Sequence, residues 1–91
     1  MHVTVKLGSV LREKAPGFVG GEGLVELPDD GEMTVADVMV ALGITPDEVK
    51  VIYRNHVFVG LSAAVKDGDR VALFPPNFIH FSQFYLRPSE E

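Results

Sequence analysis

A single amphipathic helix most constrains what this chain can fold into. Thr34 is a good N-cap, Asp37 three positions later forms a weak capping box, and Gly43 is placed to end the helix in the left-handed conformation. An isolated helix of this kind must bury its apolar face against another layer. Four apolar residues at helical spacing define that face: Val35, Val38, Met39 and Leu42.

The remaining regular segments have strand patterns, and they surround the helix in sequence. Residues 2–7 alternate apolar and polar side chains, as a half-buried strand requires. A helical turn is predicted at residues 10–15 and a glycine-rich loop at 16–23. The order is β-β-α-β-β-β, which predicts an α+β fold with the helix on one face of a mixed sheet. The predicted strands are residues 2–7, 24–27, 50–54, 57–58 and 70–74. The predicted core is Val3, Val5, Leu7, Val25, Leu27, Val35, Val38, Met39, Leu42, Val51, Tyr53, Val71 and Leu73.

Composition excludes several classes of function. The chain has no cysteine, which excludes disulfides and thiolate catalysis and fits a reducing cytoplasm. A net charge of −5 argues against nucleic acid as a partner. No stretch approaches the ~20 apolar residues of a membrane-spanning helix. Residues 15–49 carry acidic but no basic side chains, which is either ordinary solvated charge or a surface that steers toward a basic partner.

No catalytic, cofactor or metal site is expected. His2, His56 and His80 are the three histidines, and no pair of them has the spacing of metal ligands on one element. The serines lie in no nucleophile motif. The glycine-rich loop lacks a phosphate-binding signature, and Glu22 would repel an anion. We therefore expect a protein that is not an enzyme.

The order and spacing of several short motifs resemble the MoaD/ThiS family of sulphur carriers, over roughly residues 2–76. The resemblance implies a β-grasp, or ubiquitin-like, fold for residues 1–76. It also implies partners in sulphur transfer or cofactor assembly, such as an adenylyltransferase or an enzyme of molybdenum cofactor biosynthesis. The matching residues are 25–28 before a turn, 34–38 opening the helix, 41–44 ending it, and 66–76 closing the fold.

The family's functional terminus has no counterpart in this sequence. In the family the chain ends a few residues after a Pro-Pro pair with Gly-Gly, whose carboxylate is adenylated and converted to thiocarboxylate. Here Pro75-Pro76 is followed by fifteen residues without glycine, ending in Glu90-Glu91. We therefore expect a non-catalytic interaction module that kept the carrier fold. The alternative is a sulphur carrier with an atypical terminus.

Residues 77–91 are predicted to form an aromatic extension that covers the face of the sheet opposite the helix. That face is predicted to carry Leu24, Ile52, Ala72 and Phe74, flanked by Lys50, Arg54 and Arg70. Apolar residues at positions that a half-exposed sheet normally leaves polar favour an interface. The extension then packs on its own domain, on a second copy as a homodimer, or on another protein. The predicted partner-binding residues are Ile52, Phe74, Phe78, Phe81, Phe84 and Tyr85.

Overall fold

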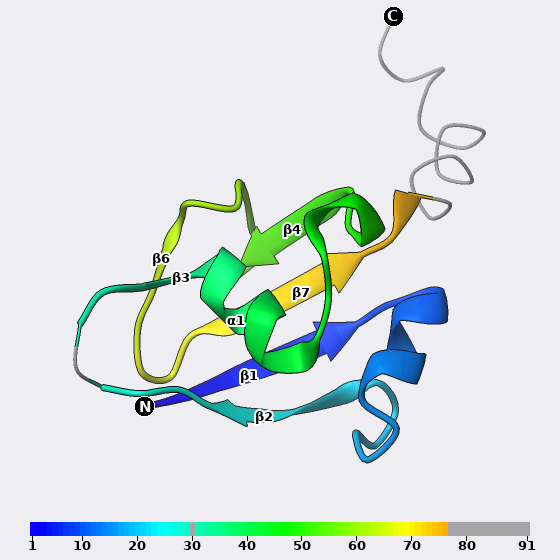
Figure 1. Cartoon of the computed structure of the whole chain (residues 1–91), viewed down its shortest axis with the longest axis horizontal. Coiled ribbons are helices and arrows are strands. Elements are labelled where there is room, and N and C mark those ends of the chain that lie inside the picture. The colour runs from blue at the N-terminus through cyan, green and yellow to red at the C-terminus, as the bar shows by residue number, and fades with distance from the viewer. Residues whose placement is uncertain (30, 77–91) are drawn as a thin grey trace, which may run out of the picture.

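The computed structural model describes residues 1–29 and 31–76, and the predictions for Phe78, Phe81, Phe84 and Tyr85 lie outside these residues. The described chain forms seven strands and one α-helix with two short 3₁₀ helices (Figure 1). The elements are β1 (His2–Leu7), η1 (Ser9–Lys14), β2 (Glu22–Glu26), β3 (Met33–Thr34), α1 (Val35–Leu42), η2 (Pro46–Glu48), β4 (Val51–Arg54), β5 (Val57–Val59), β6 (Ala64–Val65) and β7 (Arg70–Phe74).

The main sheet has five strands in the order β2-β1-β7-β4-β5. The central strand β7 and its neighbour β1 run parallel, with Val5 opposite Val71 and Leu7 opposite Leu73. The other neighbouring pairs are antiparallel. β3 and β6 form a separate two-stranded sheet, which the sequence pattern did not indicate. A mixed sheet with one main helix confirms the predicted α+β, β-grasp fold.

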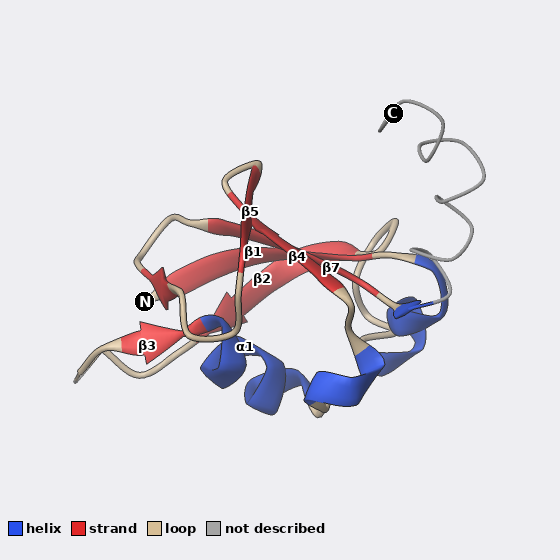
Figure 2. Ribbon diagram, turned by 90° about the horizontal axis from the view of Figure 1, so that it is seen from above, coloured by secondary structure: helices blue, strands red, loops and turns tan. Residues whose placement is uncertain are grey.

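The helix forms where its end signals place it. The Asp37 carboxylate accepts hydrogen bonds from the backbone N–H of Thr34 at 2.8 Å and from its hydroxyl at 3.1 Å. Gly43 ends the helix with φ of 72°, and the N–H of Ile44 donates to the carbonyl of Met39 at 2.9 Å. The helical segments lie on one side of the main sheet (Figure 2). No helix of residues 1–29 and 31–76 covers the opposite face, which we call the open face.

The hydrophobic core lies between the sheet and the helices. Most of the predicted core residues are buried in it, including Val35, Val38 and Met39 of α1. Leu42 packs against the core but is only partly buried. The core also contains Leu11, Ile44 and Val65, none of which the predicted core included. Leu11 comes from η1, which confirms the predicted helical turn at residues 10–15.

Strand β4 faces the opposite way from the prediction. Ile52, assigned to the open face, is only 6% exposed and belongs to the core cluster. Tyr53, assigned to the core, is 38% exposed and lies on the open face. The reason is the pairing with β7, which sets Ile52 opposite the fully buried Leu73 and Tyr53 opposite Ala72. A single register fixes the side of each residue in a strand, so the predictions for Ile52 and Tyr53 are both wrong. Val51, also predicted to lie in the core, is buried at 8% exposure.

The helical layer is joined at one end by an ion pair between η1 and η2. The Nζ of Lys14 lies 2.9 Å from a carboxylate oxygen of Glu48. A hydrogen bond from the backbone of Thr45 and the nearby Lys14 lower the pKa of Glu48. None of the helices in residues 1–29 and 31–76 is long and apolar enough to cross a membrane.

Candidate functional site

Three aromatic rings form a row on the open face of the sheet, and we call them the aromatic row. Tyr53 on β4 lies between Phe58 on β5 and Phe74 at the end of β7. Its ring centroid is 6.0 Å from that of Phe58 and 6.1 Å from that of Phe74, the latter pair meeting edge to face. Both geometries are favourable for aromatic pairs. The row remains exposed at one end, where Phe58 is 68% exposed.

Basic residues border the aromatic row on the side of β1 and β7. Lys6, His56 and Arg70, with Tyr53, Ala72 and Phe74, line a shallow recess of about 270 Å³. Arg70 forms an ion pair with Glu22, which neutralises it locally. The side chain of Lys6 makes no hydrogen bond or ion pair within the described part of the chain. The chain as a whole is acidic, so this face combines apolar surface with a local positive charge.

A tight turn holds His56 at the edge of the recess. Asn55 and His56 connect β4 to β5, and both have positive φ, at 52° and 72°. This is the two-residue hairpin geometry that normally favours Asn-Gly, so a histidine in the second position is strained. The Asn55 side chain anchors the turn, because its oxygen accepts from the N–H of Arg70 at 2.9 Å.

Asp69 also stabilises this turn through hydrogen bonds. Its carboxylate accepts hydrogen bonds from the Asn55 amide at 3.0 Å and from the backbone N–H of Lys66 at 2.8 Å. Partial burial acts to raise the pKa of Asp69, but these hydrogen bonds and the charges of Arg54 and Lys66 outweigh it. The pKa is therefore lowered, and the carboxylate stays ionised where it supports the turn.

The position of Phe74 depends on a close approach to the backbone. A Cβ added at Gly8 would collide with the Phe74 ring, so glycine lets the ring approach the backbone at the end of β1. Phe74 thus lies on the open face, as the sequence predicted, together with the exposed Leu24 of β2. Arg54, predicted to flank the patch, donates instead to the carbonyl of Ala64 at 2.6 Å.

Sequence reasoning missed four residues of this surface: Tyr53, Phe58, Lys6 and His56. The position of Lys6 could have been predicted from the sequence, because Lys6 lies between Val5 and Leu7 in a strand whose side chains alternate between the two faces. Tyr53 and Phe58 carried none, since each lies in a run of apolar residues whose facing only the sheet register decides.

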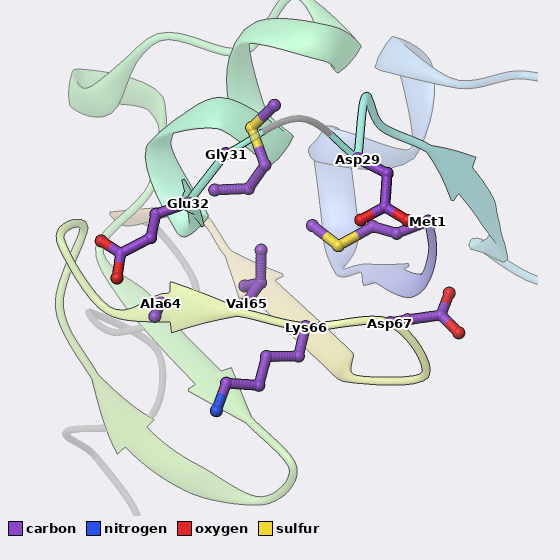
Figure 3. A pocket seen from close by; sticks show the side chains of 9 residues that line it. Met1, Asp29, Gly31, Glu32, Ala64, Val65, Lys66 and Asp67 are labelled. Atoms are coloured by element: carbon purple, nitrogen blue, oxygen red, sulfur yellow. The ribbon is translucent and has the colours of Figure 1, made fainter.

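A second hollow lies between the N-terminus and the small β3–β6 sheet (Figure 3). It has a volume of about 220 Å³. Of its labelled charged side chains, Glu32, Lys66 and Asp67 point outward, whereas Asp29 points toward Met1. The Asp67 carboxylate accepts from the N–H of His2 at 2.7 Å, which ties the loop to β1.

No three His, Asp or Glu side chains of residues 1–29 and 31–76 come together where they could hold a metal ion. The open face of the described residues has a different composition. It offers aromatic rings, a free ammonium group and a shallow recess, which together suit contact with another polypeptide surface.

Comparison with known proteins relates this geometry to a family. The model of the ThiS family matches residues 10–77. Small archaeal modifier protein 1 from Haloferax volcanii is 30% identical, with 82% of this chain and 97% of that chain covered and a TM-score of 0.63. A Pyrococcus furiosus protein designated molybdopterin converting factor, subunit 1, is 26% identical, with 84% and 98% covered and a TM-score of 0.62. None of the curated proteins compared matches the chain.

Proposed function

This chain belongs to the ThiS family, and from that premise we propose that it is a non-catalytic, ubiquitin-like module that binds a partner protein through the open face of its sheet. The partner is an enzyme of sulphur transfer or cofactor assembly, of which an adenylyltransferase is the first candidate. The Pyrococcus furiosus neighbour is by its designation one subunit of a larger factor, which supports a protein partner here.

The observation that carries the proposal is the exposed aromatic row. Large apolar side chains gathered on an uncovered sheet face are typical of interaction sites rather than of an inert surface. Tyr53, Phe58 and Phe74 supply the aromatic anchors that dominate protein interfaces. Lys6 adds a charge with no partner of its own in the described residues, which would select a partner surface carrying carboxylates.

The test is a binding titration of the full chain against the purified adenylyltransferase from the same organism, with two single variants. Phe58→Ser removes the most exposed ring of the row, whose burial contributes about 1.5–3 kcal/mol, so the affinity should fall by roughly 10- to 100-fold. Val40→Ser is the matched control, because Val40 is 76% exposed on α1, away from the open face. Equal affinity for the wild type and Phe58→Ser would contradict the proposal.

A second candidate function is that of a sulphur carrier, and membership of the ThiS family is the observation that favours it. The discriminating measurement is the intact mass of the chain from its native source, after incubation with ATP, sulphide and the adenylyltransferase. A carrier gains the mass difference of one oxygen replaced by sulphur at its terminal carboxylate. An unchanged mass, together with binding that depends on Phe58, favours the interaction module.

A further inference from the structure

The aromatic row has a candidate occupant within the same chain. Residues 77–86 read Asn-Phe-Ile-His-Phe-Ser-Gln-Phe-Tyr-Leu and contain no Asp, Glu, Lys or Arg. Four of the eight aromatic residues of the chain fall in this segment: Phe78, Phe81, Phe84 and Tyr85. It lies outside the described residues, and its chemistry matches the apolar surface that the open face presents.

We propose that residues 77–86 fold back across the open face of their own chain, cover the aromatic row and compete with the partner. This inference rests on the proposed function, because it assigns a regulator to the same surface. The two surfaces are alike in chemistry, since aromatic side chains would meet the rings of Tyr53, Phe58 and Phe74. Covering these rings would remove the largest exposed apolar side chains of the face from water.

The place where the segment begins makes the contact geometrically easy. β7 ends at Phe74, which is itself one ring of the aromatic row, and residue 77 follows only two positions after Pro75. The centroid distances from Phe74 to Tyr53 and from Tyr53 to Phe58 are 6.1 and 6.0 Å. An extended chain advances ~3.3 Å per residue, so about four residues span the row and ten span it with room to spare.

The same tether favours the chain's own face over that of a second copy. A short covalent connection holds the segment at an effective concentration of about 1 mM or above near its own domain. A second copy reaches that concentration only in a very concentrated solution. At the micromolar concentrations used for binding studies, the contact within one chain should therefore predominate over a dimer made by exchanging segments.

The consequence for binding is a reduced apparent affinity for the partner. When the segment covers the face, only the uncovered fraction of molecules is competent to bind. Removing rings from the segment should raise that fraction and tighten the complex. In the full chain, the double variant Phe81→Ser/Phe84→Ser is expected to bind the adenylyltransferase at least about fivefold more tightly.

The position of the segment can be measured directly because the chain has no cysteine. A single Ser82→Cys substitution in the full chain carries a nitroxide label, and NMR records which amide signals broaden. Signals of Tyr53, Phe58 and Ala72 should broaden, while that of Val40 on α1 should not. Broadening of both faces to the same extent, or of neither, would overturn the proposal.

A mixed sample separates the two possible sources of the segment. Isotope-labelled chains without nitroxide are combined with unlabelled chains that carry it. Broadening confined to the sample in which one chain carries both labels supports the proposal. Broadening in the mixed sample identifies a second copy as the occupant and overturns it.

The two proposals fail in different ways. If the face does not bind the partner, Phe58→Ser leaves the affinity unchanged, although the nitroxide still broadens Tyr53 and Phe58. If the segment does not cover the face, selective broadening is missing and Phe81→Ser/Phe84→Ser binds like the wild type. In that case Phe58→Ser still weakens binding, and Val40→Ser remains neutral in both experiments.

Discussion

Replacing Ile52 with alanine tests how the two faces of β4 are assigned. Ile52 is 6% exposed in the core cluster, whereas its neighbour Tyr53 is 38% exposed on the open face. Truncating a buried isoleucine to alanine costs about 2–5 kcal/mol. Truncating a half-exposed tyrosine that keeps only its ring contacts should cost about 1 kcal/mol. A domain of this size has only about 5–15 kcal/mol of stability in total, so Ile52→Ala should remove a large share of it.

Urea unfolding followed by circular dichroism gives the free energy of unfolding of both variants and the wild type. With about 4–8 °C lost per kcal/mol, Ile52→Ala should lower the melting temperature by roughly 8–40 °C, and Tyr53→Ala by less than about 10 °C. Similar slopes of unfolding free energy against urea would show that the same two-state transition is compared. A larger loss for Tyr53→Ala than for Ile52→Ala would refute the reasoning.

Three further substitutions test other parts of the structure. The pKa of Asp69 is lowered in the folded chain, so its stabilising contribution is present above the ordinary value of about 4 and is lost as pH falls through the folded value. Asp69→Asn should therefore flatten the acid loss of stability, measured as urea midpoints from about pH 2 to pH 6, and an unchanged pH profile would contradict this. His56→Gly relieves a left-handed backbone costing about 1–2 kcal/mol and should raise the melting temperature, whereas a lower one would show that the turn is not strained. Gly8→Ala should displace the Phe74 ring from Tyr53, seen as loss of their mutual NOE, and an intact NOE would show that the site has room for the added carbon.

The parts of the fold that were predictable carry local signals that agree with their tertiary contacts. Thr34, Asp37 and Gly43 specify both ends of α1 through bonds within the helix itself. Strand β7 forms at Arg70–Phe74, the range predicted for the last strand, which ends before Pro75-Pro76. In each case the side chains that decide the structure are close in sequence.

The parts that were not predictable depend on partners distant in sequence. Val51, Ile52 and Tyr53 are all apolar, so no alternation marks which side faces the core, and only the register with β7 decides it. The two-residue strands β3 and β6 are too short to show any period and exist because each pairs with the other. The candidate site was not predictable for the same reason, because its central residue, Tyr53, was predicted to lie in the core and lies on the open face.

The parallel pairing of β1 with β7 also has a consequence for biosynthesis. These two neighbouring strands come from opposite ends of the described chain, with Thr4 opposite Arg70. A nascent chain can form the β1–β2 hairpin and the helix early, but the sheet cannot close until residues 70–74 have left the ribosome. Until then, the core around Val3 and Val5 lacks the side chains that β7 contributes. Pairings so distant in sequence also slow folding, so chains cut short before β7 should be cleared by proteases rather than accumulate.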